Sequence, residues 1–162
     1  MKNRQNHTID VLFSIALFFV FSATTLVVLL LSANIYKGVV ADAENNFQTG
    51  TALSYITEKV RQHDENGNES IYLTTFDNQE ALAIAQTFHD TTYVTYIYEM
   101  NGELKETFIQ EGIPASASAG TTIMEIGSLE ITQINSNLLR ISCASQSGIQ
   151  ASTLINVHSI NN

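Results

Sequence analysis

The chain has 162 residues, 44% of them hydrophobic and 14% charged, which is enough for one compact domain with an appendage and too few for two substantial domains. From Lys37 onward, five Lys or Arg stand against fifteen Asp or Glu, and this balance excludes nucleic acid as a partner, because nucleic-acid binding relies on basic side chains at phosphates. The single cysteine, Cys143, excludes both an intrachain disulfide and a four-ligand zinc site.

The segment from Val11 to Leu31 reads VLFSIALFFVFSATTLVVLLL and contains no charge, proline or glycine. At 1.5 Å per residue, a helix of this length rises about 31 Å, which matches a bilayer hydrocarbon core of about 30 Å. Its Ser and Thr hydroxyls are expected to bond their own helix backbone. We therefore predict a transmembrane helix over residues 11–35. The alternative is a cleaved secretory signal, for which Leu31-Ser32-Ala33 is a poor small-x-small site.

Charges on either side of the span predict its orientation in a cell membrane. Lys2 and Arg4 precede it, whereas only Lys37 and then Asp42 and Glu44 follow it closely. By the positive-inside rule, residues 1–10 are expected in the cytoplasm and the C-terminal domain outside it.

The pattern after the span remains helical. Ile35 and Tyr36 directly follow the apolar run and are expected to anchor it at the membrane interface. Beyond Gly38, apolar residues recur at helical spacing: Val39, Val40, Ala43, Phe47, Leu53, Ile56 and Val60. We expect the helix to continue outside the membrane over residues 36–66, weakened at Gly38 and Gly50 and ended by turn residues from Asp64 onward. This half is amphipathic, so its apolar stripe needs a partner surface, and the strand-rich sequence downstream is the expected one.

Residues 67–162 break into short apolar-polar runs separated by turn residues, a pattern typical of an antiparallel β-sheet domain. The clearest hairpin turn is Asn101-Gly102, where both residues tolerate the positive φ of a type I′ turn. Residues 80–87 would also suit a short helix. The candidate strands are residues 70–75, 82–88, 93–99, 103–109, 122–126, 129–134, 138–144 and 150–157.

Two further features of this domain allow alternative interpretations. Residues 112–120 are small and contain the only proline, which predicts a flexible loop joining two halves of the domain, either as an exposed contact loop or as a plain connection. Cys143 lies in an apolar-alternating run and is expected to be a small buried hydrophobe, with an intermolecular disulfide as the alternative.

No pattern in the sequence indicates catalysis. Four histidines, His7, His63, His89 and His158, are scattered without metal-ligand spacing, and no nucleophile, phosphate-loop or dinucleotide motif occurs. We therefore predict no catalytic, cofactor-binding or metal residues, no cofactor and no small-molecule substrate.

The run Thr8-Ile9-Asp10-Val11-Leu12, followed by the apolar block, resembles the start of type IV pilins and pseudopilins. The resemblance implies an α+β, pilin-like fold, in which the membrane half of a long helix precedes an amphipathic half packed on an antiparallel sheet. It also implies that Asp10 aligns this helix against the end of a neighbouring subunit's helix, although an acid near a helix N-terminus is favoured by the dipole in any case. The whole chain also resembles an uncharacterised, pilin-like family of Gram-positive bacteria.

One departure from the pilin pattern bears on function. Prepilin processing needs a glycine shortly before the acid, and Arg4-Gln5-Asn6-His7 stands there instead. An anchored accessory subunit therefore fits better than a processed filament subunit. We expect a non-enzymatic, membrane-anchored accessory or structural subunit of a pilus- or secretion-type assembly, with other membrane or pilin-like subunits as partners. The alternatives are a membrane-tethered extracytoplasmic sensor or ligand-binding domain, or a secreted β protein if the N-terminal segment is cleaved.

Overall fold

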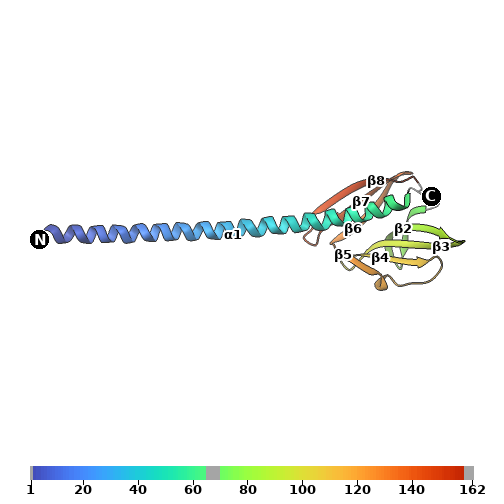
Figure 1. Cartoon of the computed structure of the whole chain (residues 1–162), viewed down its shortest axis with the longest axis horizontal. Coiled ribbons are helices and arrows are strands. Elements are labelled where there is room, and N and C mark those ends of the chain that lie inside the picture. Colours follow the sequence, from blue (N-terminus) through green and yellow to red (C-terminus); the bar gives the residue numbers. More distant parts are fainter. Residues whose placement is uncertain (1, 65–69, 159–162) are drawn as a thin grey trace. The chain divides into compact units, whose positions relative to one another are not determined.

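The structure is a computed structural model that describes residues 2–64 and 70–158, with side chains for residues 11–64 and 71–158. It contains two compact units, Met1–Ala43 and Glu44–Asn162. One long helix, α1 (Lys2–Asp64), begins in the first unit and ends in the second (Figure 1). The predicted α+β class, a long N-terminal helix packed on an antiparallel β domain, is confirmed.

The helix follows from its composition. It contains no proline, and apolar residues, chiefly Leu, Phe and Val, dominate its first half, so each backbone N–H can bond the carbonyl four residues earlier. Gly38 and Gly50, the two expected weak points, both lie within the continuous helix. Its last described residue is Asp64, where the turn-forming sequence begins.

The second unit holds two antiparallel sheets, and each predicted strand is present among the described residues. The five-stranded sheet has the order β1-β2-β3-β4-β5, and the three-stranded sheet has the order β6-β7-β8. Residues 80–87 belong to a strand and not to a short helix. The strands are β1 (Ser70–Phe76), β2 (Gln79–Phe88), β3 (Thr91–Met100), β4 (Glu103–Gln110), β5 (Thr121–Glu125), β6 (Ser128–Asn135), β7 (Leu138–Ala144) and β8 (Gln150–Asn156).

Tight turns join the first four strands. Asn101 and Gly102 have φ values of 56° and 79°, as the predicted type I′ turn requires, and Glu99 Oε1 accepts a hydrogen bond of 2.8 Å from the Gly102 N–H. The two preceding hairpins also have positive φ at both turn residues, namely Asp77, Asn78, His89 and Asp90. Short polar side chains tolerate this backbone region better than others do, which fixes the register of successive strands.

The two sheets and the C-terminal turns of α1 share one core (Figure 1). Ile56 and Val60 of the helix are fully buried there, together with Ile84 and Ile97 of the larger sheet and Ile141 of the smaller one. Each such side chain contributes roughly 1.5–3 kcal/mol when removed from water. The last turns of the helix therefore bury one face in a core to which both sheets contribute.

The chain changes sheets at Gly127, directly after the buried Ile126. The Gly127 N–H donates to the Ala144 carbonyl at 2.7 Å, and a Cβ at this glycine would lie only 2.2 Å from the Ser145 oxygen. Residues 112–120 instead join β4 to β5 within one sheet. The prediction that they join two halves of the domain was therefore wrong, because the change of sheet needs a close backbone approach that only a later glycine permits.

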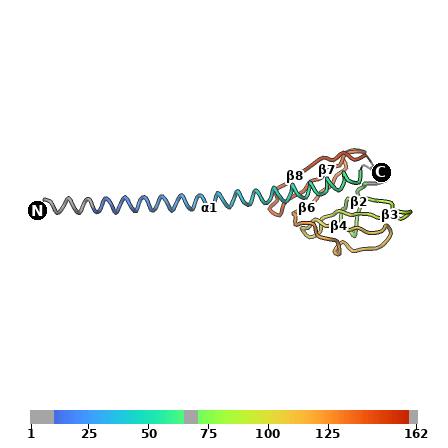
Figure 2. Tube along the Cα trace, in the orientation of Figure 1, coloured from blue at the N-terminus to red at the C-terminus, as the bar shows by residue number. Residues whose placement is uncertain are grey.

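After β8 the chain returns to the end of α1 (Figure 2). The His158 N–H donates to Asp64 Oδ1 at 2.7 Å, and its Nδ1 lies 2.8 Å from Asp64 Oδ2. The neighbouring Val157 is fully buried in the shared core. The last described residues thus fasten the smaller sheet to the helix.

Candidate functional site

The residues from Val11 to Leu31 form an uncovered apolar surface within the first unit. Their large apolar side chains are between 46% and 70% exposed, and the helix contains an 18-residue window with a mean hydropathy of 2.5, none of it buried. The Thr24 and Thr25 hydroxyls donate to the Phe21 carbonyl at 2.9 and 2.8 Å, which confirms the prediction that these hydroxyls bond their own helix. The helix is therefore a candidate single-pass membrane anchor.

The candidate alignment acid and the candidate interfacial residues flank this span. Asp10 lies within α1, and its side chain falls outside the described side chains. Ile35 and Tyr36 are 68% and 71% exposed. An exposed tyrosine shortly beyond an apolar span suits the membrane–water interface, where its ring is buried and its hydroxyl is hydrated.

The amphipathic stripe predicted after the span divides into two parts. Leu53, Ile56 and Val60 are buried in the domain core, as expected. Val39 and Phe47, by contrast, are 61% and 70% exposed. Within the second unit, the expectation that the stripe packs on the β domain was therefore wrong at Phe47, because the buried part of the helix begins only with Thr49 and Ala52.

A polar cluster fixes the helix on the larger sheet. The Tyr55 hydroxyl donates to Glu106 Oε2, and Lys59 Nζ lies 2.9 Å from Glu106 Oε1 and 5.5 Å from the centre of the Tyr55 ring. Burial, followed by the hydrogen bond to Glu106 and the charge of Glu106, raises the pKa of Tyr55. These directional contacts fix the rotation of the helix about its own axis on the larger sheet. Apolar packing alone would fix this rotation less strictly.

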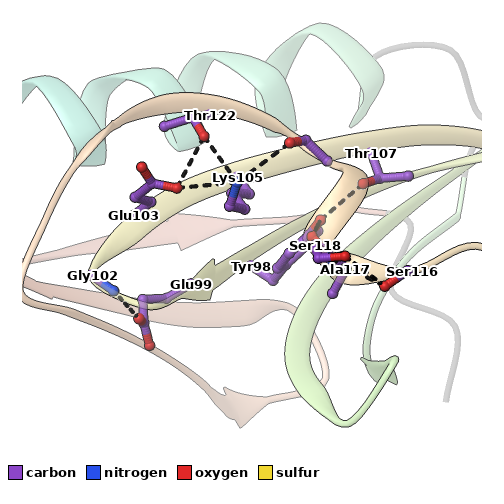
Figure 3. Close-up of polar contacts among 11 residues, drawn as sticks. Tyr98, Glu99, Gly102, Glu103, Lys105, Thr107, Ser116, Ala117, Ser118 and Thr122 are labelled. Carbon is purple, nitrogen blue, oxygen red and sulfur yellow. Dashed lines mark hydrogen bonds and ion pairs between the residues drawn. The ribbon is translucent and has the colours of Figure 1, made fainter.

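The loop of residues 112–120 is held at the start of its 3₁₀ turn η1 (Ala117–Ala119). Asp77 Oδ2 accepts hydrogen bonds from the Ala117 N–H at 2.8 Å and from the Ser116 hydroxyl at 3.1 Å. The Tyr98 hydroxyl donates to the Ala117 carbonyl at 2.7 Å and lies 2.9 Å from Thr107 Oγ1 (Figure 3). The loop is thus a fastened cover over one face of the larger sheet.

Lys105 completes this fastening. Its Nζ lies 2.9 Å from Thr122 Oγ1, 3.1 Å from Glu103 Oε2 and 3.4 Å from the Gly120 carbonyl (Figure 3). The hydrogen bond from Lys105, then that from Thr122, lowers the pKa of Glu103. Sequence reasoning missed Asp77, Tyr98 and Lys105 because no local pattern links them to residues 112–120.

A cleft of about 420 Å³ opens between the two sheets on their β1 and β6 side. It is lined by Leu73, Thr74, Thr75, Glu80, Ala81, Leu129, Glu130, Ile131 and Thr132. Apolar and acidic side chains therefore meet in it. Sequence reasoning did not find this cleft, because its two walls come from segments at least 48 residues apart, Leu73 to Ala81 and Leu129 to Thr132.

The remaining sequence candidates lie apart from one another. Cys143 is 1% exposed, which confirms the predicted small buried hydrophobe, and burial raises the pKa of its thiol to about 11. A thiol so covered cannot reach a second chain, which argues against the intermolecular disulfide.

The histidines lie apart from one another: His63 Nδ1 lies 2.6 Å from the Lys59 carbonyl, and His89 occupies a hairpin turn. Within residues 11–64 and 71–158, no group of His, Cys, Asp or Glu is arranged to hold a metal ion.

Comparison with known proteins gave one match. The model of the family described as "Domain of unknown function (DUF4860)" matches residues 47–146, more than half of the chain. The matched region covers the part of α1 that enters the core and the strands from β1 to β7, and it leaves out the apolar span. No curated protein and no solved structure matches the chain.

Proposed function

Since the chain belongs to the family described as Domain of unknown function (DUF4860), we propose its role from its own architecture: a non-enzymatic, membrane-anchored, pilin-like accessory or structural subunit of a pilus- or secretion-type assembly. The observation that carries this proposal is the division of a single helix. Its first half is apolar and uncovered, and its last turns form the core of an antiparallel domain.

The uncovered half is the proposed contact within the membrane. From Val11 to Leu31, no charged side chain interrupts the apolar surface, so lipid and the helices of other subunits are equally suitable neighbours. Phe18 and Phe19, with rings 6.5 Å apart, give this surface bulk for packing against a neighbouring helix. Binding here would need no catalytic group.

The charges fit a cytoplasmic N-terminus and an external domain. Lys2 and Arg4 would hold residues 1–10 inside, and the acidic domain would lie outside. Because no glycine precedes Asp10 at the prepilin position, the subunit would keep its anchor and act beside a filament or at its base. Asp10 would align this helix against the end of a neighbouring subunit's helix.

Orientation is tested by labelling intact cells with a membrane-impermeant maleimide. The chain carries Cys143→Ala together with one new cysteine, either Ser147→Cys on the exposed β7–β8 loop or Asn3→Cys before the span. We expect Ser147→Cys to react in intact cells and Asn3→Cys to react only after lysis. The reverse pattern, or release of the chain by alkaline carbonate, would contradict the proposed anchor.

The assembly role is tested by photo-crosslinking in cells. A benzophenone amino acid replaces Phe18 in the span, and the matched control replaces the exposed Gln146 at the end of the domain. We expect Phe18 to capture a membrane-embedded subunit of a pilus- or secretion-type assembly that Gln146 does not capture. If no span position from Val11 to Leu31 captures such a subunit, the assembly role is abandoned.

The cleft at β1 and β6 favours a second candidate, a membrane-tethered sensor or ligand-binding domain. The same topology would serve it, because an external domain on one span can pass a signal to a cytoplasmic partner. Neighbouring genes separate the two candidates. Genes for an assembly ATPase and a membrane platform favour assembly, whereas a kinase or transcriptional regulator favours sensing.

A further inference from the structure

The cleft between the two sheets is bounded by strand edges. In a strand, successive side chains point to opposite faces, so a cavity lying against a sheet face is lined by every second residue. Here Leu73, Thr74 and Thr75 of β1 line the cleft consecutively, and so do the four residues from Leu129 to Thr132 of β6. Consecutive lining means that main chain as well as side chain borders the space.

Both bordering strands end their sheets. Among the described strands, β1 pairs with β2 alone and β6 pairs with β7 alone. Every second residue of an edge strand directs its N–H and C=O away from its sheet, and these groups are available to another extended chain. Four residues of strand span about 13 Å at 3.3 Å per residue, so the cleft accommodates a short stretch of extended peptide.

The side chains of the cleft select the composition of such a peptide. Leu73, 36% exposed, and the half-buried Leu129 and Ile131 offer apolar contacts. Glu80 and Glu130 are exposed carboxylates, and no Lys or Arg among the described residues lines the space. An acidic, apolar cleft is complementary to a segment that carries both apolar and basic side chains.

We propose that this cleft binds an extended segment of a partner protein, in which apolar residues alternate with Lys or Arg, and that the segment adds to the free edges of β1 and β6 as a β-strand. Main-chain hydrogen bonds would supply affinity, and the alternation would match that of β6, where the half-buried Leu129 and Ile131 lie on one face and the exposed Glu130 on the other. Glu80, whose cross-strand partner is Thr75, would supply the second carboxylate. This inference rests on the proposed role as a partner-binding subunit and identifies the surface used outside the membrane.

The test uses the full chain in detergent micelles and three capped seven-residue peptides. The first alternates Val with Lys, the second alternates Val with Glu, and the third is the Val–Lys peptide with N-methyl groups on alternate amides. Backbone-amide NMR shifts report where each peptide binds. We expect only the unmethylated Val–Lys peptide to bind, with shifts confined to β1, β6 and their hairpin neighbours.

Two matched double variants test the charge. Glu80→Lys with Glu130→Lys reverses the carboxylates of the cleft, whereas Glu111→Lys with Glu125→Lys makes the same change at exposed positions outside it. We expect the first pair to weaken Val–Lys binding about tenfold or more and the second to change it less than about twofold. Equal weakening by both pairs, equal binding of the methylated peptide, or absence of shifts at β1 and β6 would overturn the proposal. The peptide experiments use the chain in micelles, without any component of an assembly. Their failure would therefore not contradict the proposed assembly role, which is tested separately by crosslinking from Phe18.

Discussion

Ile56 is the side chain through which the joining of helix and sheets is best tested. It is fully buried in the core that contains strands of both sheets, and truncation to Ala leaves a cavity that the surrounding side chains close only partly. Ile→Ala changes at such sites cost about 2–5 kcal/mol. Because each 1.4 kcal/mol is a factor of ten, the population of the opened domain should rise by about 30-fold to about 4,000-fold in Ile56→Ala.

The only cysteine provides the assay. Cys143 lies in the same buried cluster as Ile56, and burial raises the pKa of its thiol to about 11, so the native thiol is both covered and protonated. A thiol exposed by opening regains an ordinary pKa of about 8.5 and reacts with a soluble disulfide reagent. Under conditions in which reclosing is faster than labelling, the rate measures the opened population.

The matched control is Glu58→Ala on the exposed side of the same helix. It removes only the contact of 2.9 Å between Glu58 and Gln62, so its labelling rate should rise by about twofold at most. We expect Ile56→Ala to label at least about 30-fold faster than the parent chain. Equal rates for the two variants would refute the conclusion that the end of α1 is packed in the core shared by both sheets.

Three further outcomes follow from the polar contacts. In Gly120→Ala the new Cβ would lie 2.1 Å from the Tyr98 hydroxyl, so urea unfolding should show a loss of about 1–3 kcal/mol, and adding Tyr98→Phe should recover part of it. The raised pKa of Tyr55 contributes stability that is present below the ordinary tyrosine pKa and lost as pH rises. Because Glu106 helps to raise this pKa, Glu106→Gln should lower the ionisation midpoint of one tyrosine in an ultraviolet titration. The lowered pKa of Glu103 contributes stability above the ordinary carboxyl pKa that is lost as pH falls, so Glu103→Gln should flatten the acid limb of a pH–stability curve.

Local patterns predicted the elements of this fold because their causes are local. An uncharged run of apolar residues favours a helix at membrane length, and Asn101-Gly102 accepts the two positive φ values that close a tight hairpin. The alanines of β2 suit either a helix or a strand, and pairing with β1 on one side and β3 on the other decides for the strand. Tertiary pairing thus overrides a weak local preference.

The arrangement of the elements depended on contacts between distant residues. The change of sheet at Gly127 depends on the close approach of its backbone to the Ser145 oxygen, which no neighbouring residue in the sequence indicates. The change of sheet was therefore assigned to residues 112–120 instead. For the same reason the cleft between β1 and β6 and the hold of Asp77 on Ala117 were missed. Each of these features joins positions at least eighteen residues apart.

The two halves of the helix differ in which substitutions they tolerate. Its buried turns cannot change without disturbing both sheets, since Ile56 and Val60 contact the shared core. The residues from Val11 to Leu31 carry no such packing constraint within their own unit, because their side chains are uncovered. Substitutions there that keep the apolar character should therefore leave the free energy of unfolding of the β domain unchanged while altering which membrane helices bind. A partner specificity that moves with the span and not with the domain core is what a membrane-anchored assembly subunit requires.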